Sequence, residues 1–273
     1  MIYLKEFATE SAYNAAKDDL LTPNVSLITG DGKVKYKKGE PTPTNPIVTC
    51  KFHIDSPTDP DWPTPIIQSD AFLNEIEVMK LDGEVITKKK DFVFETAGDY
   101  IFELTLKENG KIADNAFFCC DGYNYLTDVN IGYGVTEIGY EAFRVATGFT
   151  GTTVVIPNTV TKIGSSAFDS LYGATSITLP SGLTEIEIYS FYWCKDLLSI
   201  DIPSGVTSIG DYAFEQCRSL TSITCNAPTP PTLGYEAFNN TNNCPIYVPS
   251  GSVDAYKAAE GWSVYATRIQ AIQ

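Results

Sequence analysis

Histidine and positive charge are the scarcest features of this 273-residue sequence. It has one His, and 19 Lys and Arg stand against 34 Asp and Glu, which gives a formal net charge of −15. The lone histidine, His53, lies in a strand-like segment without the partners of a catalytic triad or zinc site, so it is interpreted as a partly buried strand residue. Because the acidic excess is spread over both halves, no nucleic-acid partner is predicted.

Long apolar runs are also missing. No run of 18 apolar residues occurs, so no membrane span is predicted. The segment from Met1 to Phe7 lacks the basic stretch and the apolar stretch of a secretory signal, so export would need another route or a signal that has been removed. The apolar content of 43% is too high for a disordered chain. The length suits one to three domains with cores of their own.

One motif recurs along the second half of the chain. It has the pattern Ile-Gly-x-x-Ala-Phe, with degenerate copies at both ends, and its copies are spaced 23 to 26 residues apart. Between copies lie short segments of alternating apolar residues, such as Ile200 to Ile202, which indicate strands with one buried face. The six copies end at Phe117, Phe143, Phe168, Phe191, Phe214 and Phe238.

The repeat predicts a solenoid. A coil of this length cannot bury its own apolar face, whereas stacked coils can. With neighbouring strands ~4.8 Å apart, equivalent side chains lie above one another, and the six phenylalanines form one column in a continuous core. We therefore expect a mainly β fold in which residues 110–249 form about six coils of 23 to 26 residues and residues 250–273 form a C-terminal cap.

These repeats resemble the BspA-like, or Treponema-type, leucine-rich repeat family, whose unit reads approximately L-T-S-I-x-I-P-x-x-V-T-x-I-G-x-x-A-F-x-x-C. The matching segments are Val206 to Gly210, Ala213 to Cys217 and Leu220 to Ile223. The resemblance implies a bacterial surface or secreted protein that adheres to host proteins or other cells, and it supplies no catalytic motif. It also implies a capping helix, for which Ser252 is the expected N-cap and Gly261 the expected end.

A few positions depart from the family's unit. Glu187 stands where the unit has Gly, Ser190 where it has Ala, and Ala146 and Leu171 where it has Cys. We expect these departures to alter the shape of individual loops and to leave the solenoid intact.

The first 109 residues carry no repeat. Residues 1–44 are predicted to form a helix over 10–20 and a hairpin of strands at 25–28 and 34–36, followed by a Pro/Thr-rich linker over 41–46. Within this segment, Phe7 to Glu10, Pro23 to Ile28 and Val34 to Tyr36 resemble the start of many Bacteroides-phage virion and prophage proteins, which implies an anchor to other virion or surface proteins. Residues 45–109 are predicted to form a small Ig-like β-sandwich that also covers the N-terminal edge of the solenoid, with strands at 47–54, 75–81, 84–88, 92–94 and 100–106.

No reactive centre is evident. The seven cysteines include no C-x-x-C pair, and Cys194 and Cys217 each follow a repeat phenylalanine by three residues, so reduced core cysteines are the preferred interpretation over a disulfide between stacked neighbours. The acidic pairs Asp18-Asp19 and Asp59-Pro-Asp61 lack a calcium-loop pattern and are interpreted as solvated. No metal and no cofactor are predicted.

Tyrosine is the one enrichment that suggests a binding surface. Twelve of the 16 tyrosines lie at or beyond residue 110, several of them beside a repeat phenylalanine. Amphipathic aromatic side chains on a rigid surface suit protein or glycan binding, although they also suit a role in shielding the flank of the solenoid. The candidate binding residues are Tyr140, Tyr189, Tyr192, Trp193, Tyr212 and Tyr235.

Three functional hypotheses follow. The leading one is a non-enzymatic adhesion or recognition protein of a phage virion surface that contacts a host cell-surface protein or glycan. Its oligomeric state is left open, with a homotrimer as one option because phage fibres are commonly trimeric. The second is a Bacteroidota cell-surface or extracellular adhesin of the same family whose signal has been removed. The third is a glycan-active enzyme, since two carboxylates about 5 to 10 Å apart can run glycoside hydrolysis.

Overall fold

The computed structural model describes residues 4–6, 25–30, 33–38 and 45–273, apart from 56, 58–63, 109 and 118–124. The chain forms two compact units, residues 1–44 and 45–273. In the first, β1 (Leu4–Glu6), β2 (Val25–Gly30) and β3 (Lys33–Lys38) form an antiparallel sheet of order β1-β3-β2. Pairing of β2 with β3 confirms the predicted hairpin. The helix predicted for 10–20 and residues 41–44 of the predicted linker lie outside the described residues.

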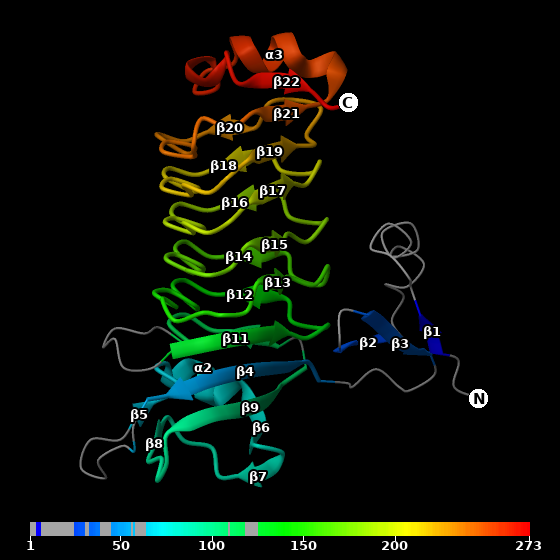
Figure 1. Cartoon of the computed structure of the whole chain (residues 1–273). Helices are drawn as coiled ribbons and strands as arrows, with labels where there is room; N and C mark the ends of the chain where they lie inside the picture. The colour runs from blue at the N-terminus through cyan, green and yellow to red at the C-terminus, as the bar shows by residue number, and fades with distance from the viewer. Residues whose placement is uncertain are drawn as a thin grey trace. The chain divides into compact units, whose positions relative to one another are not determined.

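The second unit contains a stack of coils, as the repeats predict (Figure 1). One strand of each coil after the first joins a six-stranded parallel sheet, the long-strand ladder, in which Ile200 pairs with Ile223 and Ile223 with Ile246. Equivalent residues of successive coils therefore lie side by side. The ladder consists of β13 (Thr153–Val155), β15 (Ser176–Thr178), β17 (Ser199–Ile202), β19 (Ser222–Cys225), β21 (Ile246–Val248) and β22 (Ile269–Ala271).

A second, shorter strand of each coil carries the repeat isoleucine. These strands form two parallel three-stranded sheets, together called the short-strand ladder: β10 (Lys111–Ile112), β12 (Glu137–Ile138) and β14 (Lys162–Ile163), then β16 (Glu185–Ile186), β18 (Ser208–Ile209) and β20 (Thr232–Leu233). Threonine hydroxyls reinforce the stacking, since the Thr207 hydroxyl donates to the carbonyl of Thr184 at 3.1 Å and that of Thr221 donates to the carbonyl of Leu198 at 2.9 Å.

The phenylalanine column is confirmed. All six rings are buried, and consecutive rings stack with centroids 5.2 to 5.6 Å apart and planes inclined by 4 to 14°. The column ends on aromatic side chains at both ends, because Phe117 also contacts Phe72 and Phe238 also contacts Trp262. The core of the solenoid therefore continues without a break into the structures that cover its two edges.

Glu187 marks the one interruption of the short-strand ladder. A Cβ added at Gly139 would lie 2.5 Å from the backbone nitrogen of Asp114, and one added at Gly164 would lie 2.7 Å from the carbonyl carbon of Gly139. The repeat glycine therefore allows successive backbones to approach closely. Glu187 occupies this position in its coil, and the ladder divides between β14 and β16. The phenylalanine column continues past this point, so the departure changes the loop and leaves the stack intact.

The predicted Ig-like β-sandwich is not confirmed. The described part of 45–131 holds one five-stranded antiparallel sheet of order β11-β4-β9-β6-β7, beside a two-stranded ribbon and a short helix. The residues that a second sheet would require form the ribbon and the helix instead. Phe72 of the helix packs in the core with Phe117. The elements are β4 (Ile47–Ile54), β5 (Thr64–Pro65), α2 (Asp70–Glu75), β6 (Ile76–Leu81), β7 (Glu84–Ile86), β8 (Asp91–Phe92), β9 (Gly98–Leu106) and β11 (Tyr125–Ile131).

This sheet covers the N-terminal edge of the solenoid, as the sequence predicts. β11 is the long strand of the first coil, and it pairs antiparallel with β4, so that Val129 lies opposite Cys50. One hydrophobic core spans both parts. Pairing with β4 covers the edge of the first long strand, which removes a route to edge-to-edge aggregation there.

The C-terminal cap consists of η1 (Ser250–Ser252), α3 (Val253–Ala258), η2 (Ser263–Tyr265) and β22. Ser252 occupies the N-cap position, as expected, but its hydroxyl makes no hydrogen bond to the helix. It donates instead to the carbonyl of Pro228 at 2.6 Å. The helix ends at Ala258, before Gly261, which has a φ of +76°. β22 pairs with β21 as the last strand of the long-strand ladder, and α3 covers it (Figure 1).

Five cysteines lie in the described residues, and all five are free and buried: Cys50, Cys194, Cys217, Cys225 and Cys244. The thiols of Cys194 and Cys217 donate to the carbonyls of Phe168 and Phe191, each at 3.2 Å. Burial raises the pKa of the Cys217 thiol well above its ordinary value. The interpretation of Cys194 and Cys217 as free thiols in the core is therefore confirmed, whereas Cys119 and Cys120 lie outside the described residues.

These thiols are expected to resist alkylation while the protein is folded. Iodoacetamide reacts with the thiolate, and both burial and a raised pKa keep Cys217 as an inaccessible thiol. Mass spectrometry after treatment at about pH 8 should find the peptides that contain Cys194 and Cys217 unmodified in native protein and modified in guanidinium. Rapid labelling of Cys217 in the native protein would contradict this packing.

Candidate binding surface

The turn that follows each short strand has an unusual backbone. In every described coil the residue two positions before the repeat phenylalanine has a positive φ, and in most coils so does the residue two positions after it. Asn and Ser take these places in some coils, as at Asn115 and Ser166, whereas Tyr189, Tyr212 and Trp193 take them with φ of 57°, 57° and 55°. This conformation costs an L-residue about 1 to 2 kcal/mol relative to the right-handed one, and bulky side chains adopt it rarely.

Six aromatic side chains from these turns form a connected chain across four coils. Ring centroids are 6.4 Å apart for Tyr172 and Trp193, 6.1 Å for Trp193 and Tyr192, and 5.2 Å for Tyr192 and Tyr189. Tyr189 then stacks on Tyr212 at 4.9 Å with planes inclined by 4°, and Tyr212 meets the edge of Tyr235 at 5.6 Å. We call this set the aromatic face: Tyr172, Tyr189, Tyr192, Trp193, Tyr212 and Tyr235.

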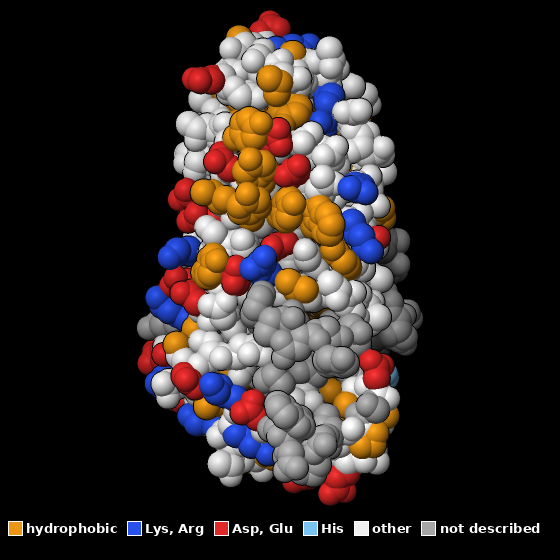
Figure 2. Space-filling model, turned by 90° about the vertical axis from the view of Figure 1, so that its left-hand side faces the viewer, with side chains coloured by type: hydrophobic (Ala, Val, Ile, Leu, Met, Phe, Trp, Pro, Cys, Tyr) orange, Lys and Arg blue, Asp and Glu red, His pale blue; other side chains and the backbone are white. Residues whose placement is uncertain are grey.

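The aromatic face is open to solvent along one edge of the coils. Trp193 is 41% exposed and Tyr235 is 63% exposed, whereas the other four side chains are half-buried. Figure 2 looks onto the edge where the turns lie and shows hydrophobic side chains gathered in a band over the coils, with acidic side chains beside them. A contiguous exposed aromatic band of this kind is typical of interaction surfaces.

Tyr140 lies apart from the aromatic face. Its hydroxyl donates to Glu141 at 2.7 Å, an interaction that raises the pKa of Tyr140 above its ordinary value. The structure therefore brings together five of the six predicted binding residues. It adds Tyr172, which sequence reasoning missed because it lies four residues after Phe168, a position where other coils carry Lys195 or Arg218.

Charge divides the aromatic face into two ends. At one end the Lys195 ammonium lies 4.2 Å from the ring centroid of Tyr172, a cation–π contact. At the other end are Tyr212 and Tyr235. Partial burial and then the negative charge of neighbouring groups raise the pKa of Tyr212, and a hydrogen bond to Glu236 raises the pKa of Tyr235.

A family model described as the BspA type leucine-rich repeat region, with six copies, matches residues 61–150 and 148–257. The chain belongs to the BspA-type leucine-rich repeat family. The match does not include residues 1–44, on which the likeness to phage proteins rests, so the phage hypothesis stays a prediction. No curated protein matches the sequence.

Two solved structures are similar to this BspA-type chain. A leucine-rich repeat protein from Bacteroides ovatus ATCC 8483 is 18% identical, with 59% of this chain and 57% of that chain covered and a TM-score of 0.37. A leucine-rich cell surface protein from Faecalibacterium prausnitzii A2-165 is 24% identical, with 47% and 45% covered and a TM-score of 0.32. The chain thus spans 57% and 45% of the solved chains that it matches.

Two buried carboxylates of the BspA-type coils belong to an ion cluster. The Arg144 guanidinium donates to Glu141 at 2.6 Å and to Asp169 at 2.9 Å, and the Ser170 hydroxyl donates to Asp169 at 2.8 Å. Burial raises the pKa of Asp169 despite these bonds. Because Arg144 bridges both carboxylates, the cluster links two coils and is not arranged as the open acid and base that glycoside hydrolysis needs.

His53 lies on β4, half-buried as expected. Its Nδ1 is 2.6 Å from Asp99, and Lys51 lies 2.6 Å from the same carboxylate. Hydrogen bonds first from Lys51 and then from His53 lower the pKa of Asp99. The described residues contain no group of three or more His, Cys, Asp or Glu that could hold a metal ion, and none of their helices is long and apolar enough to cross a membrane.

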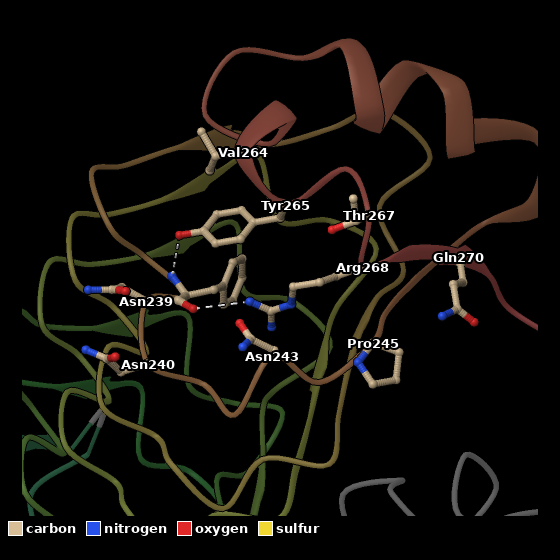
Figure 3. A pocket seen from close by; sticks show the side chains of 10 residues that line it. Asn239, Asn240, Asn243, Pro245, Val264, Tyr265, Thr267, Arg268 and Gln270 are labelled. Atoms are coloured by element: carbon tan, nitrogen blue, oxygen red, sulfur yellow. Dashed lines mark hydrogen bonds between the residues drawn. The ribbon is translucent and has the colours of Figure 1, made fainter.

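A shallow depression of about 620 Å³ lies where the last repeat meets the cap (Figure 3). Its polar side chains hold the cap onto that repeat. The Arg268 guanidinium donates to the carbonyl of Cys244 at 2.7 Å, and the Tyr265 hydroxyl accepts from the backbone nitrogen of Phe238 at 3.3 Å. Arg268 and Tyr265 therefore attach the cap to the last repeat.

Proposed function

We propose that this protein is a non-enzymatic recognition protein of a bacterial cell surface and that the aromatic face is its ligand-binding surface. Membership of the BspA-type family supports the recognition role, since the family resemblance implies adhesion to host proteins or other cells and supplies no catalytic motif. The surface location is likewise what the resemblance implies. This proposal corresponds to the cell-surface alternative of the sequence analysis.

The single observation that carries the proposal is the connected chain of six rings over four coils. The left-handed positions do not require an aromatic residue, because Asn115, Glu141 and Val145 hold them in other coils. The backbone alone therefore does not account for Tyr189, Trp193 and Tyr212 at these places. Rigid aromatic side chains lose little entropy on binding, so they bind with a small ordering penalty. A surface with these properties is suited to a protein or glycan ligand.

A binding array tests the proposal. The protein should bind a subset of host glycans or host surface proteins, and the double substitution W193A/Y235A should weaken that binding by about tenfold or more, since truncating a central aromatic contact typically costs over 1 kcal/mol. Both side chains are exposed, so the melting temperature should stay near that of the wild type.

Tyr133 supplies the matched control. It lies in the turn after β11, outside the aromatic face, and is 48% exposed. Y133A should leave binding unchanged. Equal binding by W193A/Y235A and the wild type would overturn the assignment of the surface, and release of a cleaved product from any bound glycan would overturn the non-enzymatic assignment.

A further inference from the structure

We infer that the ligand of the aromatic face is a basic polypeptide segment, with an arginine or lysine side chain held between Tyr212, Tyr235 and the carboxylates beside them. This inference rests on the proposed function and names its partner class. It follows from four features, two of which belong to the C-terminal end of the aromatic face.

The first feature is the set of carboxylates near the two rings. Glu215 and Glu236 act electrostatically on both Tyr212 and Tyr235, and Asp211 acts on Tyr212. Asp211 is fixed in place, because its side chain accepts a hydrogen bond of 2.7 Å from the backbone nitrogen of Tyr235. The rings and the acids therefore belong to one local surface formed by two adjacent coils.

The second feature is that these carboxylates have no positively charged partner among the described residues. Asn239 donates to Glu215 and to Glu236, both at 3.2 Å, and no Lys or Arg of the described chain forms an ion pair with Asp211, Glu215 or Glu236. Arg218 is held by Gln216 at 2.8 Å. Negative charge at this end therefore remains available to a cation from outside.

The third feature is a contact of the same chemistry within the molecule. At the opposite end of the aromatic face, Lys195 places its ammonium 4.2 Å from the centroid of Tyr172. A ring of this surface thus already accepts a cation. The geometry of Tyr212 and Tyr235, an edge-to-face pair with acids beside it, allows a guanidinium to stack on a ring and pair with a carboxylate at once.

The fourth feature is the charge of the whole chain. A net charge of −15 attracts basic partners over distances longer than a contact and repels acidic ones. A neutral glycan would use the rings for stacking but would gain nothing from the unpaired carboxylates. The observations therefore favour a cationic peptide over a neutral sugar.

The test uses a capped, fluorescently labelled peptide with several arginines spaced by glycines, the same peptide with citrulline in place of arginine, and the same peptide with glutamate. Citrulline keeps the shape of arginine and removes its charge. The arginine peptide should bind the full-length protein, the citrulline peptide at least about fivefold more weakly, and the glutamate peptide not at all. Affinity for the arginine peptide should also fall at about 1 M salt, where exposed charges are screened.

Variants locate the site. E215Q and E236Q should each weaken binding of the arginine peptide by about two- to fivefold, the range for an exposed ion pair, and Y235A should weaken it further. E260Q is the matched control, because Glu260 is an exposed acid in the cap and should not affect binding.

The outcomes separate this inference from the proposed function. Equal affinity for the arginine and citrulline peptides, or an E215Q/E236Q double variant that binds the arginine peptide like the wild type, would overturn the inference. Binding to a glycan that W193A/Y235A abolishes, together with no binding of the arginine peptide, would keep the recognition role and make the aromatic face a sugar site. Failure of every glycan, protein and peptide to bind would overturn both.

Discussion

Replacing Phe191 with alanine is expected to lower the free energy of unfolding by about 3 to 5 kcal/mol. The ring is fully buried and stacks between Phe168 at 5.6 Å and Phe214 at 5.2 Å, so its removal leaves a cavity in the middle of the column. Each coil of a solenoid contacts only its two neighbours, so removing the Phe191 ring weakens the interfaces with both adjacent coils. Urea denaturation followed by circular dichroism would measure the change.

The Y133A variant provides the reference, because its side chain is exposed and its effect should stay within about 0.5 kcal/mol. F191A has a second expected signature. Weaker coupling at the centre of the stack should broaden the unfolding transition or divide it in two, since the coils on either side of Phe191 then unfold more independently. A loss below about 1 kcal/mol with an unchanged transition would show that the column does not carry the stability assigned to it.

Replacing Trp262 with alanine is expected to cost a similar amount, about 3 to 5 kcal/mol. Trp262 is fully buried in the cap, where it contacts Phe238 and Tyr256. Its indole nitrogen donates to the carbonyl of Pro231 at 2.7 Å. The substitution therefore removes a large apolar side chain and leaves a buried acceptor without its donor.

W262A should also aggregate. Loosening the cap releases β22 and uncovers the edge of β21, whose unpaired backbone groups can then pair with another chain. Size-exclusion chromatography with light scattering would detect the larger species, and F191A, which leaves the cap in place, should show less of it. V264A is the control within the cap, because Val264 is 76% exposed. A monomeric W262A protein with wild-type stability would contradict the role assigned to the cap.

The repeat half of the fold was predictable because each coil has the same pattern of buried and exposed residues. The spacing of the phenylalanines and the alternation in segments such as Ile200 to Ile202 are local signals, and every copy reinforces the others. β22 was missed because its sequence, Ile269–Ala271, follows the cap and lacks the repeat motif. Its position is set by pairing with β21, a contact that no local pattern reveals.

The N-terminal sheet was less predictable for a different reason. The strands at 47–54 and 100–106 were found from alternation, but alternation does not tell whether the partner layer is a second sheet or another structure. Helix α2 has only six residues, too few for helical periodicity to show. Its local signals are Asp70 in the first turn and Ser69, whose hydroxyl accepts from the backbone nitrogen of Phe72 at 3.3 Å. The core was therefore assigned the wrong second layer.

The candidate site was predictable in composition and less so in arrangement. Tyr189 and Tyr212 each lie two residues before a repeat phenylalanine, so the stacking of equivalent residues predicts their contact, whereas Tyr235 lies three residues before Phe238 and meets the Tyr212 ring from the neighbouring position. The separation of Tyr140 follows from the one coil between it and Tyr189, which carries Ser165 and Ser166 at the corresponding places. The hydrogen bond of the Tyr140 hydroxyl to Glu141, which Arg144 also holds, is a side-chain contact that the repeat pattern does not reveal.

The regular spacing of the rungs limits how an extended chain can lie along them. Neighbouring strands advance by ~4.8 Å, whereas an extended polypeptide advances by ~3.3 Å per residue. Two strand spacings and three extended residues therefore span the same distance, about 10 Å. A bound strand that runs parallel to the long axis of the stack would meet equivalent places only with every third side chain, so the periodicity of its sequence, as well as its composition, decides how many anchors it can use.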